Sequence, residues 1–253
     1  MVDVHIVGAG PGDPELITRK GYRLVQEADV VIYAGSLVNP AILEACKPGC
    51  EIHNSATMNL DAVLAVMKAA VADGKKVVRL HTGDPAIYGA IQEQMDALAG
   101  MGITYEVVPG VSSFLATAAA LKQEYTLPNV SQTVIITRME GRTPMPPKEK
   151  LRMLAAHEAT MCIFLSVQML DKVVAELIEG GYDKTTPVAI VVKASWPDQR
   201  IIRGTLETIA DIVAEEGVLR QAMIVVSHVL DSEYELSKLY DKGFAHMYRS
   251  AKD

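Results

Sequence analysis

The chain has 253 residues, of which 49% are hydrophobic and 22% charged, a composition that supports a globular core in one large domain or two small ones. The net charge of -7 argues against a nucleic-acid binder, because neutralising phosphates requires clustered lysine and arginine. No apolar run approaches the roughly 20 residues of a membrane span, and the N-terminus lacks a basic leader, so we expect a cytoplasmic protein with no membrane partner.

The first half of the chain alternates short hydrophobic strands with helices. We expect strands at residues 4–7, 30–33, 76–80 and 104–108, and helices at 14–27, 60–72, 87–98 and 113–121. Asp13 and Pro14 are typical of a helix start. Strands that are hydrophobic almost without interruption predict a parallel sheet that is covered on both faces.

Three loops rich in glycine and proline follow strands of this predicted sheet, at residues 8–14, 83–89 and 109–113. Sheets of this kind bind ligands beyond the carboxyl ends of their strands. Glycine also allows the backbone to approach a ligand closely. The three loops together therefore predict a ligand site.

The first of these loops, Gly8-Ala9-Gly10-Pro11-Gly12, is not a dinucleotide-binding fingerprint. Its spacing is G-x-G-x-G, Pro11 removes a backbone donor, and no acidic residue follows the second strand to hold a ribose. It is not a phosphate-binding loop either, because no Gly-Lys-Ser/Thr follows. These features disfavour an oxidoreductase that uses NAD.

The second half changes character. We expect strands at residues 133–137, 161–165, 188–192, 200–203 and 223–227, and helices at 170–179 and from 205. This order predicts an α+β domain with a mixed sheet. We place an N-terminal α/β domain with the glycine loops at residues 1–120 and a C-terminal α+β domain at 121–253.

Cysteine and histidine give no sign of a metal site. Cys46, Cys50 and Cys162 are too few for a disulfide framework, and the histidines are not spaced as metal ligands. Reduced thiols and no bound metal are expected.

Several long motifs resemble the tetrapyrrole methylase family. They are VGAGPGDPELIT (7–18), HTGDPAIYGAIQEQM (81–95) and VPGVSSFLATAAA (108–120). Others resemble the subgroup that methylates carbon 11 of precorrin-4 or cobalt-precorrin-4 in cobalamin biosynthesis: YAGSLVNP (33–40), TLPNVSQTVIITRMEGRTPMP (126–146), KASWPDQRIIRGTL (193–206) and KLYDKGFAHMYR (238–249). The run GDPAIYG looks closer to the cobalt form, and the metal state of the substrate stays open.

The resemblance implies two α/β domains with S-adenosyl-L-methionine in the cleft between them, S-adenosyl-L-homocysteine as product, and a homodimer. The cofactor-binding positions that it implies are Pro11, Gly83, Asp84, Pro85, Ile87, Ser112, Ser113, Leu165, Ala194, Ala222 and Met223. Walls of small and apolar residues with backbone hydrogen bonds suit an adenosyl group. The substrate that the resemblance implies is a small-molecule tetrapyrrole.

Catalysis and substrate binding involve fewer candidates. Asp84 and Tyr88 are the catalytic candidates. Asp84 could accept a proton, although Asp before Pro is also a common turn residue, and Tyr88 could also stack on or hydrogen-bond to the macrocycle. Arg138, Arg142 and Lys193 are candidates for the substrate carboxylates, because arginine binds carboxylates in a bidentate manner. Two alternatives remain: a methylase of another tetrapyrrole such as uroporphyrinogen-III, and a non-catalytic carrier of a corrinoid intermediate.

Overall fold

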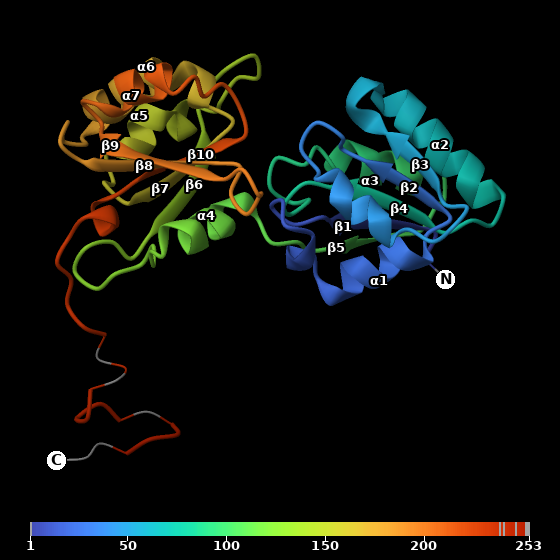
Figure 1. Ribbon diagram of the computed structural model, residues 1–253, viewed down its shortest axis with the longest axis horizontal. Helices are drawn as coiled ribbons and strands as arrows, with labels where there is room; N and C mark the ends of the chain where they lie inside the picture. Colours follow the sequence, from blue (N-terminus) through green and yellow to red (C-terminus); the bar gives the residue numbers. More distant parts are fainter. Residues whose placement is uncertain (1, 238, 240, 246, 251–253) are drawn as a thin grey trace. The chain divides into compact units, whose positions relative to one another are not determined.

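The computed structural model describes residues 2–237, 239, 241–245 and 247–250 (Figure 1). Lys238, Tyr240 and His246 of the 238–249 motif lie outside the described residues. Contacts between Cα atoms divide the chain into two compact units. The first contains residues 1–120 together with 193–200, and the second contains residues 121–192 and 201–253.

The first unit is built on a five-stranded sheet of order β3-β2-β4-β1-β5 in which every pair is parallel. Its strands are β1 (Val4–Gly8), β2 (Val30–Tyr33), β3 (Glu51–Asn54), β4 (Val77–His81) and β5 (Tyr105–Val108). Parallel strands require crossover connections, and the intervening helices supply them. The prediction of a parallel sheet is confirmed.

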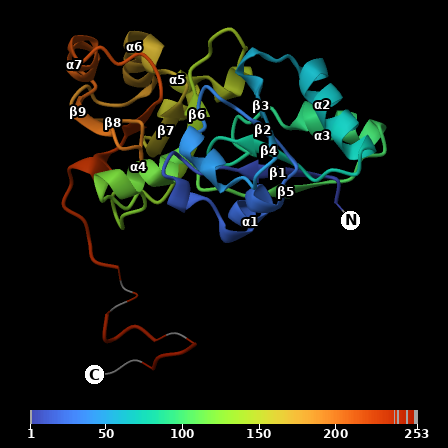
Figure 2. The same ribbon diagram turned by 45° about the vertical axis from the view of Figure 1, so that its right-hand side comes forward.

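Helices cover both faces of this sheet. They are α1 (Arg19–Glu27), α2 (Leu60–Ala72) and α3 (Gln92–Gly100), with 3-10 turns at Pro14–Leu16, Pro40–Ala45 and Ser55–Thr57. A fourth helix, α4 (Ser113–Leu121), follows β5 in the chain. Leu24 and Val25 of α1 pack on one face, and Met67 of α2 and Leu98 of α3 pack on the other. The helices α2 and α3 lie side by side in both ribbon views (Figure 2). This burial on two faces explains why the strands are hydrophobic throughout.

The structure corrects two predicted helices. Residues 14–27 do not form one helix, because Asp13 caps only the short turn Pro14–Leu16 and Thr18 caps α1 separately. The predicted helix 87–98 begins later, at Gln92, because Tyr88 and Ala90 have left-handed φ values of 55° and 49°. A right-handed helix cannot pass through such residues.

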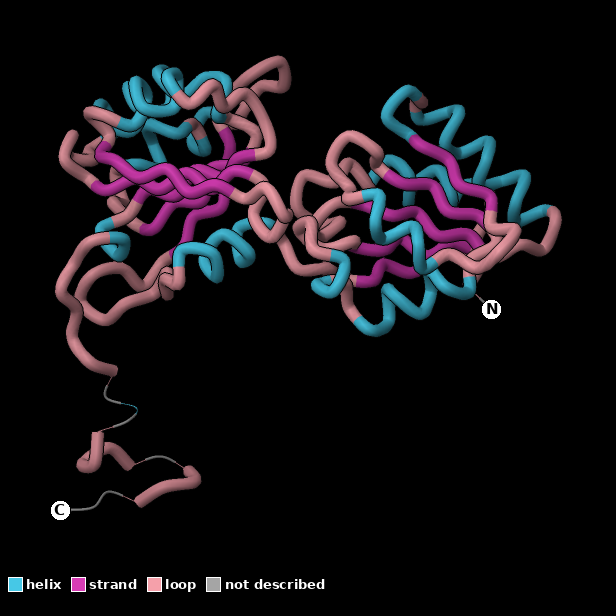
Figure 3. The backbone as a smooth tube through the Cα atoms, viewed as in Figure 1, coloured by secondary structure: helices cyan, strands magenta, loops and turns pink. Residues whose placement is uncertain are grey.

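The second unit contains a mixed sheet of order β6-β7-β10-β8-β9, drawn in magenta in Figure 3. Its strands are β6 (Val134–Arg138), β7 (Thr160–Phe164), β8 (Pro187–Val192), β9 (Arg200–Thr205) and β10 (Ala222–Val226). β6 is parallel to β7, whereas β10 runs antiparallel to both β7 and β8. The mixed sheet predicted for this half is confirmed, and so is the fold class.

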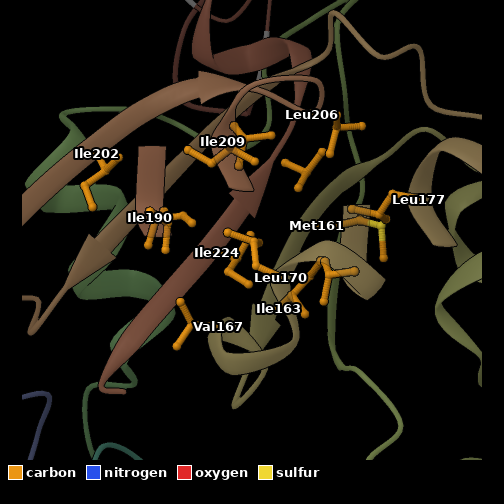
Figure 4. Close-up of a cluster of buried hydrophobic side chains, with 14 of the residues drawn as sticks. Met161, Ile163, Val167, Leu170, Leu177, Ile190, Ile202, Leu206, Ile209 and Ile224 are labelled. Atoms are coloured by element: carbon orange, nitrogen blue, oxygen red, sulfur yellow. The ribbon is translucent and has the colours of Figure 1, made fainter. Parts of the chain in front are cut away.

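Three helices, α5 (Leu151–Ala155), α6 (Leu170–Gly180) and α7 (Ile209–Glu215), pack on this second sheet, and 3-10 turns lie at Pro147–Glu149, Val167–Met169 and His228–Leu230. Their buried side chains form one hydrophobic cluster with strand residues such as Ile163, Ile190 and Ile224 (Figure 4). Among the described residues, no helix has the length and hydrophobicity needed to cross a membrane.

Candidate functional site

The three glycine-rich loops lie together at the carboxyl ends of neighbouring strands of the first sheet. They follow β1, β4 and β5, and these strands are neighbours in the order β4-β1-β5. Gly10 and Gly83 are paired by two backbone hydrogen bonds, of 3.3 Å from Gly10 N to Gly83 O and 2.8 Å from Gly83 N to Gly10 O. The loops after β1 and β4 are therefore joined directly through the backbone.

Two glycines permit the close packing of these loops. A Cβ atom on Gly8 would lie 2.6 Å from Gly83 O and 2.7 Å from Gly110 Cα. A Cβ atom on Gly110 would lie 2.1 Å from Gly83 O. Neither position can accept a side chain unless the backbone moves, so these glycines serve the contact between loops rather than a ligand.

Gly83 differs from them, because a Cβ atom at this buried position would make only ordinary van der Waals contacts. Its φ is 59°, and an added Cβ would approach Ser112 Cα and Ser113 N only to 3.6 and 3.7 Å. Ser112 is buried. Gly83, Ser112 and Ser113, all predicted at the cofactor site, therefore lie next to one another in the first unit.

Asp84 ties two of the loops together. One carboxylate oxygen accepts the N–H of Ala86 at 2.8 Å, and the other accepts the N–H of Gly110 at 2.9 Å. Hydrogen bonds to an ionised acceptor are stronger than neutral ones. The turn role of an Asp before Pro is therefore observed, and a role of Asp84 as a catalytic base stays a prediction.

The segment after Pro85 makes a tight left-handed turn that presents Tyr88. A Cβ on Gly89 would lie 2.1 Å from Pro85 O, so this glycine is required. The Tyr88 side chain is 44% exposed. Its placement on an exposed turn beside the glycine loops suits contact with a large ligand.

Buried polar side chains support this turn from the sheet below. Arg79 of β4 donates to Gln94 Oε1 and to Ile32 O at 3.2 Å each, and Gln94 donates to Ala90 O at 3.0 Å. Burial lowers the pKa of Arg79 to about 10. Burial, with the charge of Arg79, lowers the pKa of His81 to about 3, so this imidazole is neutral near pH 7.

The loop after β1 has further partners that the sequence did not indicate. Pro11 O accepts the indole N–H of Trp196 at 3.0 Å, and Asp13 N donates to Ser195 Oγ at 3.0 Å. Asn39 Nδ2 donates to Gly12 O at 2.8 Å. Trp196 is the single tryptophan of the chain. Its rarity was the sequence signal that could have marked it as a residue of the site.

In the second unit, several predicted residues gather at one end of the sheet. Leu165 follows β7, Arg138 ends β6 beside Phe164, and Ala222 and Met223 begin β10, which is antiparallel to β7. Leu165 is 65% exposed with a φ of 54°, whereas Met223 is buried. Their assignments as cofactor residues stay predictions.

The basic candidates have different surroundings. Arg138 donates to the carbonyl oxygens of Met139, Thr143 and Pro144, so its guanidinium holds its own loop. Arg142 is exposed on that loop.

Lys193 and Ala194 begin the 193–200 segment, which belongs to the first unit. Lys193 pairs with Asp198 at 2.5 Å and lies over the Trp196 ring. Ala194 is buried. Within the described part of the chain, no group of three His, Cys, Asp or Glu residues could hold a metal ion.

Comparison with known proteins extends this description. The model of the tetrapyrrole (corrin/porphyrin) methylases matches residues 3–210. A cobalt-precorrin-4 C(11)-methyltransferase of Methanocaldococcus jannaschii is 63% identical over 249 residues, covering 98% of this chain and 96% of that protein. The X-ray structure of a cobalamin biosynthetic enzyme, a cobalt precorrin-4 methyltransferase, has a TM-score of 0.88 at 49% identity and covers 90% of this chain and 96% of its own.

A more distant solved structure contains a ligand. It is a Thermus thermophilus uroporphyrin-III C-methyltransferase complexed with S-adenyl homocysteine. Its TM-score is 0.75 at 30% identity, covering 90% of this chain and 93% of its own. The matched region 3–210 includes all three glycine-rich loops and the 193–200 segment.

Proposed function

Because the chain belongs to the tetrapyrrole (corrin/porphyrin) methylase family, we propose that it methylates carbon 11 of cobalt-precorrin-4 with S-adenosyl-L-methionine, in cobalamin biosynthesis. The observation that carries this proposal is the 63% identity with the Methanocaldococcus jannaschii cobalt-precorrin-4 C(11)-methyltransferase over nearly all of both chains. Metal-free precorrin-4 is the nearest variant of the same reaction.

The loops of the first unit fit an adenosyl cofactor. An added Cβ on Gly83 would lie 3.6 Å from Ser112 Cα and 3.7 Å from Ser113 N, so these predicted cofactor residues lie side by side. Pro11 and Pro85 are buried next to the glycines of their loops. We assign Pro11, Gly83, Asp84, Pro85, Ile87, Ser112 and Ser113 to this cofactor.

The reaction demands little acid–base or metal chemistry from the protein. The bound cofactor supplies an electrophilic methyl group on a sulfonium. The residues of this chain have to hold the two reactants in line and exclude water, which can lower a barrier by roughly 7–11 kcal/mol. A set of loops fixed by backbone contacts, as after β1, β4 and β5, suits that task.

Substrate contacts fall to side chains that are more exposed. We propose that Tyr88 contacts the macrocycle and that Arg142 binds a substrate carboxylate, with Arg138 holding the loop that carries Arg142. Lys193 is a weaker candidate, since Asp198 already neutralises it.

We further propose that the protein is cytoplasmic and forms a homodimer. Light scattering after size-exclusion chromatography would test the oligomeric state.

Methylation of uroporphyrinogen-III is the second candidate function. The Thermus thermophilus uroporphyrin-III C-methyltransferase, with a TM-score of 0.75, favours it, although its identity of 30% is less than half the 63% of the cobalt-precorrin-4 relative. A non-catalytic carrier of a corrinoid intermediate is the third, and multiple turnovers would exclude it.

The test supplies purified protein with tritiated S-adenosyl-L-methionine and, in parallel, cobalt-precorrin-4, precorrin-4 or uroporphyrinogen-III. We expect many turnovers with cobalt-precorrin-4 and few with uroporphyrinogen-III. Preferred transfer to uroporphyrinogen-III would overturn the substrate assignment. Retention of one methylated product per protein would favour the carrier.

A further inference from the structure

The 193–200 segment leaves the second sheet after β8 and returns to it at β9, yet its contacts place it in the first unit. Its own fold is compact. Trp196 N donates to Lys193 O at 3.0 Å, and Gln199 N donates to Trp196 O at 3.1 Å. Ser195 N donates to the side chain of Gln199 at 2.8 Å. The segment is thus a preformed turn that presents Ser195 and Trp196.

This turn holds consecutive peptide groups of the loop after β1. The indole N–H of Trp196 binds Pro11 O, and Ser195 Oγ accepts Asp13 N. The indole ring lies directly against Gly12, where an added Cβ would be 2.1 Å from Trp196 Cδ1. Only a glycine at position 12 leaves room for the ring in this position.

The contacts lie next to the proposed cofactor residues. Gly10, one residue before Pro11, is paired with Gly83. The path from Gly10 to Asp13 is therefore fixed at one end by Gly83 and at the other by the 193–200 segment. Displacement of the indole would free Pro11 and loosen the pairing that sets the position of Gly83.

We infer that Trp196 is a positioning residue for the cofactor: it acts through Pro11 and Gly12 to hold the loop after β1 in its binding conformation. This inference rests on the proposed function, because it needs S-adenosyl-L-homocysteine to bind at the glycine-rich loops. It also makes the single tryptophan a natural fluorescent reporter of that binding.

The test measures S-adenosyl-L-homocysteine affinity by calorimetry for Trp196→Phe and Trp196→Ala, with Tyr22→Ala, an exposed aromatic of α1, as control. Losing the indole hydrogen bond in Trp196→Phe should weaken binding about 3- to 10-fold. Trp196→Ala should weaken it further, and Tyr22→Ala should not. In the wild type, the ligand should shift the tryptophan emission.

A second measurement separates positioning from a general loss of structure. Gly12→Ala should be harmful in the wild-type background and tolerated when Trp196 is already Ala, since the ring that it strikes is gone. In steady-state kinetics, Trp196→Phe should raise KM for S-adenosyl-L-methionine and leave kcat within about twofold.

The outcomes distinguish this inference from the proposed function. Wild-type protein that fails to bind S-adenosyl-L-homocysteine would overturn both. Wild-type binding together with unchanged affinity in folded Trp196→Phe and Trp196→Ala would overturn the positioning role alone. A Gly12→Ala penalty that persists without the indole would also contradict it.

Discussion

The end of the first sheet and the end of the second sheet both carry predicted functional residues, but they are constructed differently. At the first, glycine backbones touch one another and Asp84 binds two N–H groups, so the backbone fixes the geometry. At the second, exposed side chains such as Leu165 and Arg142 extend from individual strand ends and loops. The first end therefore suits a cofactor whose structure does not vary. At the second end, specificity for the substrate depends on single side chains.

The strongest test of this difference is Gly110→Ala. The new Cβ would lie 2.1 Å from Gly83 O, a backbone atom that cannot move freely. We expect a loss of about 3–4 kcal/mol in the free energy of unfolding, measured in urea. Gly100→Ala is the matched control, because nothing lies within 4 Å of its Cβ and α3 should gain slightly. Equal urea midpoints for the two variants would contradict the packing argument.

His81 should make the first unit sensitive to acid. Its pKa of about 3 lies below the value of about 6.5 expected when unfolded. The unfolded state alone therefore binds a proton as the pH falls below 6.5, and stability drops by about 1.4 kcal/mol per pH unit, or about 2–3 kcal/mol by pH 4.5.

The measurement compares unfolding free energies of wild type and His81→Gln between pH 7 and 4.5. The variant should lose less stability over this range than the wild type. His157→Gln, at an exposed position in the second unit, should follow the wild type. Parallel curves for wild type and His81→Gln would show that His81 does not carry the effect.

Asp84→Asn should have an intermediate effect. Asparagine keeps only one acceptor oxygen, so one of the N–H groups of Ala86 and Gly110 loses its partner, at a cost of about 1–2 kcal/mol. Calorimetry should show S-adenosyl-L-homocysteine binding weakened about tenfold. Asp96→Asn, on the exposed side of α3, should bind normally. Unchanged affinity in Asp84→Asn would show that the hydrogen bonds of Asp84 to Ala86 and Gly110 do not support cofactor binding.

The smallest effect is expected at the second sheet. Arg142→Ala should raise KM for the tetrapyrrole about 2- to 5-fold and leave S-adenosyl-L-homocysteine affinity unchanged, since exposed ion pairs contribute about 1 kcal/mol or less. Arg203→Ala, exposed on β9, is the control. Similar KM values for the two variants would argue that Arg142 does not bind substrate.

The parts that were predictable from sequence are those with local signals. Buried strands, the helix at Leu60–Ala72 and the three glycine-rich loops follow from hydrophobic runs and turn residues. β3 was missed because Glu51–Asn54 is a mostly exposed edge strand with little hydrophobic pattern. The left-handed Tyr88 was missed because no rule places a tyrosine at such a φ.

The long-range contacts of the site were not predictable. Trp196 and Pro11 are 185 residues apart in the chain, and Asp13 and Ser195 are 182 apart. No spacing rule connects such positions. Arg138 was predicted to bind substrate because of its charge, and its charge gave no sign of the three hydrogen bonds that it donates to carbonyl groups of its own loop. Its role in substrate binding stays a prediction.

The position of the transferred methyl group on the product decides between the proposed reaction and its alternatives. Cobalt-precorrin-4 is incubated with the protein and S-adenosyl-L-methionine carrying a ¹³C-labelled methyl group, and the purified product is examined by NMR. We expect a single labelled methyl group, bonded to carbon 11. A label at any other carbon, or no label while S-adenosyl-L-homocysteine still binds, would contradict the proposed reaction and leave only the cofactor assignment.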